Sequence, residues 1–317
     1  MASSYRYGFN MNVRRVRALL VLAGVLFVLA LPAGIFFSRP PALILSDASF
    51  DALYGVRRAL IAQVRLSLSL FRPVKKVMLA ESAGPDAAAF ALEEASGRPW
   101  GAILPARYGR GGRRYAEDHP RTPVAIIEGR ESRGRGAPGN AGRNLAYIGA
   151  DSQTDAYRAG RCAAILALAG GGGILFFQDE VNFPFNRESF IAGLREEGFM
   201  ENPVFLATNS NYAAPGDISC VVMTGQIPIF VEKNTKAPVI LFSWLDTALT
   251  PANVKIIFDD SPWAMAFKVF RQFPGGDSAE IFPDVKPLPS KITIPGGRIG
   301  DPDVLQKIKT AVQAEFL

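Results

Sequence analysis

The stretch PVILFSWLDTALTPANVKIIFDDSPWAMAFKVFRQF, residues 238–273, decides the fold class of this 317-residue chain. It contains two continuous apolar runs, 239–242 and 254–258, and each is too short for a helix and ends abruptly at polar residues. Short apolar runs of this kind are typical of strands buried on both faces of a parallel sheet. An amphipathic segment, 262–273, follows the second run at once, so the stretch predicts the alternating strands and helices of an α/β fold.

Polar side chains stand where these two predicted strands end. Ser243, Trp244 and Asp246 follow the first strand, and Asp259 and Asp260 follow the second. Ligands of open parallel sheets bind outside the carboxyl ends of the strands, so Trp244, Asp246 and Asp260 are candidate ligand contacts. The alternative is that both acids only cap turns and helix starts, and that the Trp244 ring packs in the core.

The same alternation extends along the chain. Further strands are predicted at 42–45, 76–79, 101–104, 123–127, 145–148, 174–177, 204–207, 218–223 and 291–294. Helices are predicted at 50–70, 86–95, 154–168, 186–197, 227–232 and 303–316. This order predicts two doubly wound sheets, divided near residue 144, with polar strand ends lining a cleft between them.

The formal charge of +6 lies at the amino terminus. Residues 1–40 hold five arginines and no acid, which leaves 30 basic and 29 acidic residues in the rest of the chain. A nearly neutral folded part gives no reason to expect a surface that follows nucleic-acid phosphates. The arginine-rich and glycine-rich segment 107–143 has few aromatic residues for stacking on bases, and we expect it to form solvated loops.

Residues 18–37 form a run of twenty uncharged residues, ALLVLAGVLFVLALPAGIFF, preceded by Arg14, Arg15 and Arg17. The run is long enough to cross a bilayer, and the arginines would keep residues 1–17 in the cytoplasm. A cleaved signal peptide, with its best cleavage site after Ala30, is the alternative. Both interpretations place the rest of the chain outside the cytoplasmic membrane.

Residues for catalysis, metals or cofactors are scarce. The two cysteines, Cys162 and Cys220, have no metal-ligand spacing, and we expect two buried thiols instead of a disulfide. His119 is the only histidine and lies in the arginine-rich segment, and no Ser-His-Asp or Cys-His set can be assembled around it. The glycines 170–173 precede a predicted strand and no Lys-Ser or Lys-Thr pair follows them, which excludes a phosphate loop. We therefore expect no cofactor and no enzyme activity.

Several motifs together resemble the type I periplasmic binding proteins, which include sugar receptors of ABC importers and the ligand domains of lactose-repressor-like regulators. The segment IGADSQTDAYRAGRCAAILAL, 148–168, is similar to that family's crossing strand and next helix. The segment ILFFQDEVNFPFNRESFIAGLREEGF, 174–199, is similar to its strand, loop, arginine and F-x-x-G helix. SDASF, 46–50, and the stretch 238–273 are closest to the basic membrane lipoproteins and purine nucleoside receptors, although this chain lacks their lipoprotein cysteine and carries Trp244 before its aspartate.

The resemblance implies two Rossmann-like lobes joined by a hinge of three segments. The first lobe would comprise residues 42–143 and about 258–276, and the second 144–257 and about 277–317. A closing receptor of this kind needs acids, amides and aromatic faces at the strand ends to hold a small ligand. The positions that the resemblance points to are Asp47, Phe50, Arg107, Asp179, Arg187, Thr224, Trp244, Asp246 and Asp260.

The function implied is capture of a sugar or nucleoside for delivery to an ABC importer. The alternative is a membrane-anchored sensor that passes the bound state to a signalling partner. A transcription regulator is excluded in its usual form, because the uncharged run occupies the place of a DNA-binding domain. An enzyme that uses a carboxylate pair such as Asp179 and Asp246 is a further class, but no residue marks such a pair as catalytic.

Overall fold

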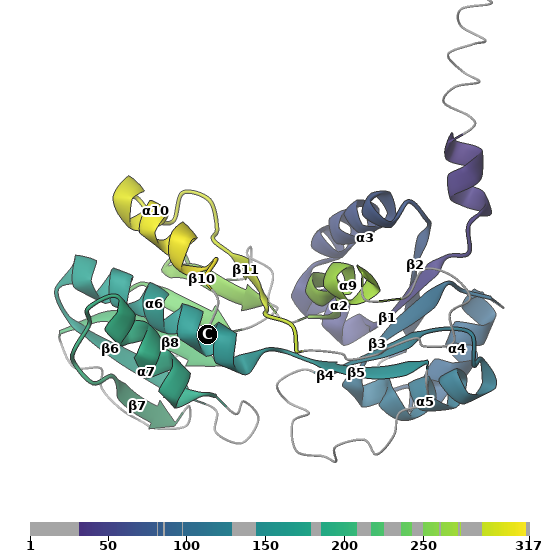
Figure 1. The fold of residues 1–317 in the computed structure, drawn as a ribbon, viewed down its shortest axis with the longest axis horizontal. Helices are drawn as coiled ribbons and strands as arrows, with labels where there is room; N and C mark the ends of the chain where they lie inside the picture. The colour runs from purple at the N-terminus through teal and green to yellow at the C-terminus, as the bar shows by residue number, and fades with distance from the viewer. Residues whose placement is uncertain are drawn as a thin grey trace, which may run out of the picture.

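The computed structural model describes residues 32–80, 82–84, 86–96, 98–128, 144–178, 185–207, 217–224, 236–242, 250–259, 261–271, 273 and 287–314. These residues form two α/β lobes, each built on one mainly parallel sheet, which lie side by side (Figure 1). A short helix over residues 32–38 precedes the first lobe. The predicted fold class, two doubly wound lobes with parallel sheets, is confirmed.

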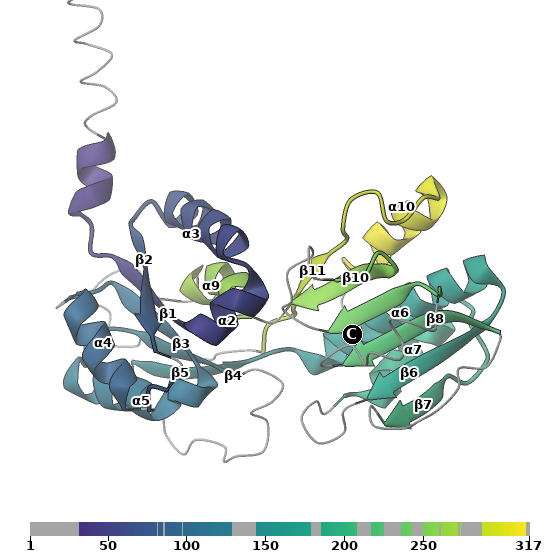
Figure 2. The same ribbon diagram turned by 180° about the vertical axis from the view of Figure 1, so that it is seen from behind.

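The first lobe is a five-stranded parallel sheet in the order β2-β1-β3-β4-β5. Its strands are β1 (Ala42–Asp47), β2 (Val74–Leu79), β3 (Gly101–Pro105), β4 (Val124–Glu128) and β5 (Leu145–Gly149). One face carries α2 (Ala48–Tyr54), α3 (Val56–Leu70) and α9 (Pro262–Arg271), and the other carries α4 (Ala87–Ala95) and α5 (Gly109–Asp118). Both ribbon views show α9 returning from far along the chain to lie beside α3 (Figure 2).

The continuous apolar runs have a direct structural cause. Successive side chains of β1 point to opposite faces of the sheet, so Ile44 joins the core under α3 while Leu43 and Leu45 join the core under α4. All three are almost fully buried. A strand covered on both faces must therefore be apolar at every position, as the sequence pattern indicated.

The second lobe is a six-stranded sheet in the order β11-β10-β9-β8-β6-β7. Its strands are β6 (Gly173–Gln178), β7 (Val204–Ala207), β8 (Ile218–Thr224), β9 (Val239–Phe242), β10 (Val254–Asp259) and β11 (Lys291–Thr293). Only β11 is antiparallel among these described strands. One face carries α6 (Ser152–Gly170), α7 (Arg187–Glu196) and α10 (Pro302–Ala311) over an aromatic core.

The chain passes between the lobes after β5, between β10 and α9, and before β11. The first and third of these connections run beside each other, because Ala150 forms a parallel bridge with Leu288. The Asp151 N–H donates to the Leu288 carbonyl over 2.8 Å, and the Leu288 N–H donates to the Gly149 carbonyl over 3.0 Å. Two separate parts of the sequence thus form one hydrogen-bonded connection between the lobes.

Three predictions about individual segments need correction. The helix predicted at 50–70 is two helices, because Gly55 adopts a positive φ of 89° and separates α2 from α3. The strand at 145–148 is β5 of the first sheet, whereas the sequence placed it at the start of the second lobe. The last helix ends at Ala311, short of the predicted residue 316.

The prediction of solvated loops over 107–143 is wrong for its first part. Residues 106–108 form a 3₁₀ turn and 109–118 form α5, which buries Tyr115 and Ala116 against the sheet. A Cβ at Gly112 would lie 3.3 Å from a Leu104 methyl group, so its glycine lets the helix approach the strand closely. Tertiary packing outweighs the low helix propensity of the glycines here. Residues 129–143 lie outside the described part.

The predicted membrane run 18–37 is described only from residue 32, where it is helical. Within the described ranges, no helix is long and apolar enough to cross a bilayer. The helix predicted at 227–232 also lies outside the described residues. Cys162 and Cys220 are both buried and both free.

Candidate functional site

The carboxyl end of β1 carries Asp47, whose side chain is almost fully buried. One carboxylate oxygen accepts a hydrogen bond of 2.9 Å from the Phe50 N–H and thereby caps the start of α2. The other oxygen forms an ion pair with Arg107, which follows β3. β1 and β3 are neighbours in the sheet, so the fold brings together two predicted site residues that are sixty positions apart.

Arg107 is the exposed member of this pair, with 47% of its side chain accessible to solvent. Its guanidinium donates a hydrogen bond of 2.7 Å to the Tyr108 hydroxyl and lies 4.7 Å from the centre of that ring. Burial raises the pKa of Tyr108, and the hydrogen bond from Arg107 opposes this shift. Asp47 and Tyr108 thus hold a permanent positive charge at the rim of the first sheet.

Phe50 supplies an aromatic face at the same edge. It stacks on Tyr54 with ring centres 5.2 Å apart and planes within 18°, and the Arg58 guanidinium lies 4.3 Å from the centre of the Tyr54 ring. Tyr54 is buried and Phe50 is partly exposed. Tyr54 was missed from sequence, although its position four residues after Phe50 on a helix would have indicated the contact.

A second charged group lies beneath these residues. Asp51 accepts a hydrogen bond of 2.9 Å from the Ser46 hydroxyl and forms an ion pair with Lys76 of β2. Asp51 and Ser46 are buried and Lys76 is partly exposed, so this ion pair fixes α2 against the edge of the sheet. Sequence reasoning missed this ion pair, because Lys76 lies on another strand.

The two lobes are joined by an ion pair between Arg58 of α3 and Asp259 at the end of β10. Asp259 is fully buried and also accepts a hydrogen bond of 3.0 Å from the Ser261 N–H. The Ser261 hydroxyl in turn accepts from the Ala264 N–H over 3.2 Å, at the start of α9. The carboxylate therefore serves the connection between the lobes.

The third connection is fixed in a similar way. Asp155 of α6, which is fully buried, accepts hydrogen bonds of 2.9 Å from the Ser290 N–H and 2.6 Å from the Ser290 hydroxyl. Lys268 of α9 donates to the Pro289 carbonyl over 2.7 Å. Burial lowers the pKa of Lys268, and the negative charge of Asp155 acts in the opposite direction.

The second lobe places Arg187 at the start of α7. Its Nε donates a hydrogen bond of 2.9 Å to the Gln178 side chain at the end of β6, and its guanidinium lies 4.6 Å from the centre of the Phe205 ring. Arg187 is exposed and lies on a different sheet from Asp47, Phe50 and Arg107. The Arg187 side chain is thus held by Gln178 at the end of β6 and by Phe205 of the neighbouring strand β7.

Thr224, at the end of β8, is fully buried. Its hydroxyl lies 3.5 Å from the Phe177 carbonyl oxygen, at the long limit for a hydrogen bond. Contact of this hydroxyl with a ligand would require the strand end to open. The predicted roles of Asp179, Trp244, Asp246 and Asp260 fall on residues outside the described part and stay predictions.

The carboxyl edges of both sheets point toward the space between the lobes (Figures 1 and 2). The first sheet brings a fixed cation and an aromatic face to this edge, which suits a polar ligand with a flat or hydroxylated ring. Among the residues that the structure describes, no group of three or more His, Cys, Asp or Glu side chains could hold a metal ion.

Solved structures with the same fold provide the comparison. An ABC transporter solute-binding protein from Conexibacter woesei is 15% identical, with a TM-score of 0.55 over 86% of this chain and 95% of that chain. A transcriptional activator of the comK gene from Bacillus halodurans is 12% identical, with a TM-score of 0.56 over 87% and 96% of the two chains. A periplasmic solute-binding protein from Actinobacillus succinogenes, solved with D-allose, is 11% identical, with a TM-score of 0.50 over 82% and 99%.

These similarities identify the fold as that of the type I periplasmic binding proteins, which confirms the resemblance drawn from the sequence motifs. The two similar solute-binding proteins and the activator share one architecture with different roles, so the fold alone does not assign a ligand. No protein-family model matches the chain, and a search of curated proteins also finds no match.

Proposed function

We propose that this chain is an extracytoplasmic solute-binding protein that closes its two lobes on a small polar ligand, a sugar or a nucleoside. The observation that carries the proposal is the group formed by Arg107, Asp47 and Phe50 at the carboxyl edge of the first sheet. Edges of this kind are where open α/β folds bind their ligands. In this proposal the chain has no enzyme activity and delivers its ligand to an ABC importer.

Each member of the group has a distinct role in the proposal. Asp47 uses one oxygen for the helix cap and the other for Arg107, so it acts as a positioning residue. Arg107 presents donors to ligand hydroxyl or carbonyl oxygens, and Phe50 covers one face of the ring. The opposite lobe would contribute Arg187 and, from outside the described residues, Asp179, Trp244 and Asp246, while Asp260 would act from the connection between β10 and α9.

An anchored sensor is the second candidate function, and the uncharged run 18–37 favours it. A receptor held at the membrane can pass its closed state to a membrane-embedded partner without being released. Importer delivery and sensing use the same ligand site. The two functions differ in the partner, so purification of the full chain from membranes with its bound proteins distinguishes a permease from a signalling protein.

The test of the ligand site begins with a thermal-shift screen of the full chain against D-allose, other monosaccharides and purine nucleosides. A ligand at about 100 times its dissociation constant adds about 2.7 kcal/mol of stability and raises the melting temperature. Calorimetry on Arg107→Ala should then show a loss of affinity of about tenfold to a hundredfold, since a hydrogen bond from a charged donor contributes about 1.5–3 kcal/mol.

Arg110→Ala is the matched control, because Arg110 lies one turn away on α5, is largely exposed and pairs with Asp86 at 3.3 Å. We expect it to leave affinity unchanged. Asp246→Ala should weaken binding by the same tenfold to hundredfold as Arg107→Ala, if both lobes hold the ligand. A confirmed ligand that binds Arg107→Ala and Asp246→Ala with wild-type affinity would show that it occupies another site.

A further inference from the structure

The outward side of α3 carries a stripe of uncovered apolar residues. We call Val56, Leu60, Ile61, Val64 and Leu68 the outer face of α3, and each is at least 44% exposed. Spacings of three and four residues put them on one side of the helix, while Ala59 and Leu66 are buried on the other side. α3 is therefore apolar toward the core and apolar toward the outside.

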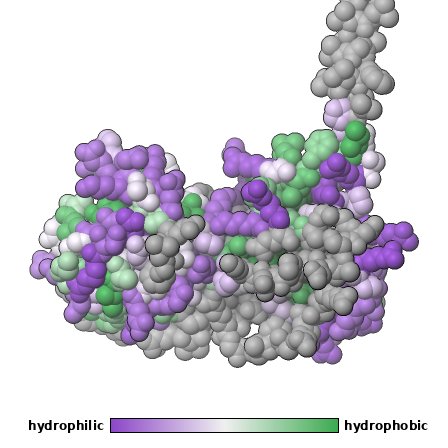
Figure 3. Space-filling model, viewed as in Figure 1, coloured by the Kyte–Doolittle hydropathy of each residue, from purple (hydrophilic) through white to green (hydrophobic). Residues whose placement is uncertain are grey.

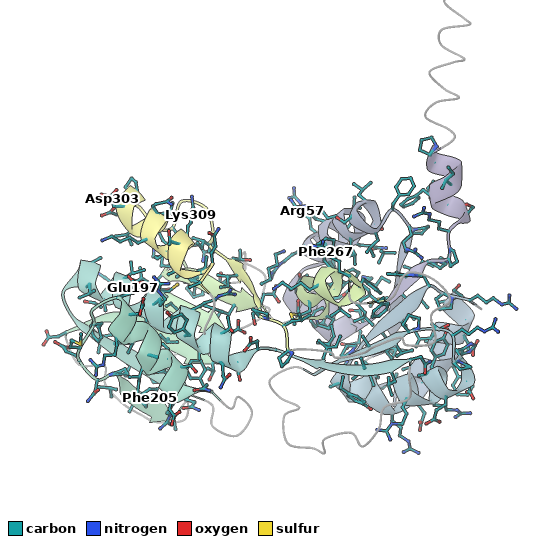
Figure 4. All side chains as sticks on the ribbon, viewed as in Figure 1. Arg57, Glu197, Phe205, Phe267, Asp303 and Lys309 are labelled. Atoms are coloured by element: carbon teal, nitrogen blue, oxygen red, sulfur yellow. The ribbon has the colours of Figure 1, made fainter. Side chains whose placement is uncertain are left out.

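The charges on α3 are all positive. The helix contains Arg57, Arg58 and Arg65 and no acidic residue. Arg58 is used in the ion pair with Asp259, whereas Arg57 and Arg65 are exposed beside the outer face. Arg57 extends away from the helix on the upper side of the first lobe (Figure 4). An apolar stripe bordered by arginines is the pattern of a helix that lies in a membrane interface.

The carboxyl end of α3 lies against the described end of the uncharged run. The Phe36 ring packs against Phe71, just after α3, with centres 5.9 Å apart. The Arg39 guanidinium lies 5.0 Å from the centre of the Phe71 ring and donates to the Phe71 carbonyl over 3.3 Å. Arg72 donates back to the Pro40 carbonyl over 3.2 Å. In the space-filling view, apolar side chains over α3 continue toward the amino-terminal segment (Figure 3).

We infer that the outer face of α3 lies on the outer surface of the membrane that holds residues 18–37, with Arg57 and Arg65 against anionic lipid headgroups. This inference rests on the anchored form of the receptor, which the second candidate function describes. Only residues 38–41 separate the run from β1, and four residues span at most about 14 Å. The first lobe is therefore close to the bilayer whenever the run is inserted. Contact with lipid covers apolar surface that water would otherwise reach.

A second copy of this chain is a weaker occupant for the same face. In a symmetric contact the same patch meets itself, so the exposed arginines Arg57 and Arg65 of two copies would approach each other without an acid on α3 to neutralise them. A stable interface also buries about 800 Å² on each partner, which requires more surface than one helix of fifteen residues offers. Anionic lipid satisfies both the apolar stripe and the positive charge.

The test places a fluorescent probe on the outer face in the full chain. The variant Leu60→Cys is labelled with an environment-sensitive dye and reconstituted in vesicles with about 30% anionic phosphatidylglycerol, in the range of natural anionic membrane surfaces. Labelling is selective, because Cys162 and Cys220 are fully buried and burial raises the pKa of Cys162 to about 12. Phe90→Cys is the matched control, since Phe90 is an apolar residue of α4, 66% exposed, on the opposite face of the sheet.

Lipids with a quencher in the shallow acyl region should reduce emission from position 60 about twofold, because interfacial helices insert about 5–10 Å into the headgroup boundary. Emission from position 90 should not change. Replacing both arginines, Arg57→Gln with Arg65→Gln, should weaken the quenching in anionic vesicles. Unquenched emission from position 60 in a chain that resists carbonate extraction overturns the docking and leaves the anchor in place.

Two other results have equally definite meanings. Adding lipid at constant protein dilutes the chains in the bilayer. If the emission change at position 60 then disappears, and two Leu60→Cys chains also cross-link, a second copy covers the outer face of α3. This result overturns the docking on lipid. A chain that carbonate releases, but that is still quenched at position 60 by anionic vesicles, overturns the anchor and supports the docking. Failure of the docking and failure of the anchor are thus distinguishable, and neither result depends on ligand binding, which tests the proposed function separately.

Discussion

The helices α3 and α6 each cover one face of the sheet of a lobe, α3 in the first lobe and α6 in the second, yet their surroundings differ. α6 is covered on nearly every side: it packs against α7, α10 and the sheet, and it buries residues along its whole length. α3 packs against α9 and the sheet on one side and leaves its outer face uncovered. The contrast shows that two helices that each cover a sheet can differ in how much apolar surface they leave exposed.

The residues of the two helices explain the difference. α6 is rich in alanine and carries Gly160, which allows α7 to approach closely. α3 instead exposes larger aliphatic side chains along its outer face, and Arg57 and Arg65 lie exposed beside them. Small residues promote close helix packing, whereas long apolar side chains bordered by arginine are suited to an interface with lipid.

The largest effect is expected from Gly160→Ala. A Cβ at this position would lie 2.1 Å from the Phe190 carbonyl oxygen, and backbone cannot rotate away as a side chain can. The two helices must separate, so we expect a loss of about 3 kcal/mol or more in the free energy of unfolding. Urea denaturation of the full chain measures this loss.

Gly109→Ala is the control for that change, because its Cβ would meet only Ile126 methyl groups at 3.6 Å, an ordinary contact. The helix propensity of alanine should leave it neutral or raise stability by up to about 1 kcal/mol. A Gly160→Ala chain as stable as wild type would show that the α6 and α7 contact is looser than the structure indicates.

A smaller effect is expected at the point where α6 is attached to the third connection between the lobes. Asp155→Ala removes the acceptor of two hydrogen bonds from Ser290, one from its N–H and one from its hydroxyl, in a buried place. Loss of bonds to a charged acceptor predicts about 1.5–3 kcal/mol of destabilisation.

Ser290→Ala is the control for this change, because it removes only the hydroxyl bond and keeps the hydrogen bond from the Ser290 N–H to Asp155. We expect it to lower the free energy of unfolding by about 1 kcal/mol. Thermal unfolding of both variants tests the order. Equal losses in the two variants would mean that Asp155 contributes through the hydroxyl alone.

The sequence predicted the fold because parallel strands buried on both faces must be apolar throughout, and runs such as 239–242 are easily recognised. It failed where tertiary contacts outweighed local preference, as in α5, where buried Tyr115 holds a glycine-rich segment helical. Asp47 and Arg107 were both predicted as site residues, but their mutual ion pair depends on the order of strands in the sheet and was not visible in the sequence. The same reason hides the pair of Arg58 with Asp259.

The smallest change in stability is expected on the outer face of α3. Comparing an exposed with a buried leucine of this one helix tests whether the outer face stabilises the fold. Leu60→Gln replaces an apolar side chain that is already 57% exposed, so the free energy of unfolding in detergent-free urea should change by less than about 0.5 kcal/mol. Leu66→Gln, on the buried side of the same helix, should cost about 2 kcal/mol or more, because it places an amide among apolar side chains. Similar losses in both variants would show that Leu60 is packed against the protein itself, and the contrast between α3 and α6 would then disappear. A neutral Leu60→Gln that also weakens vesicle contact would instead separate the two roles: one side of α3 stabilises the lobe, and the other side contributes only when a membrane is present.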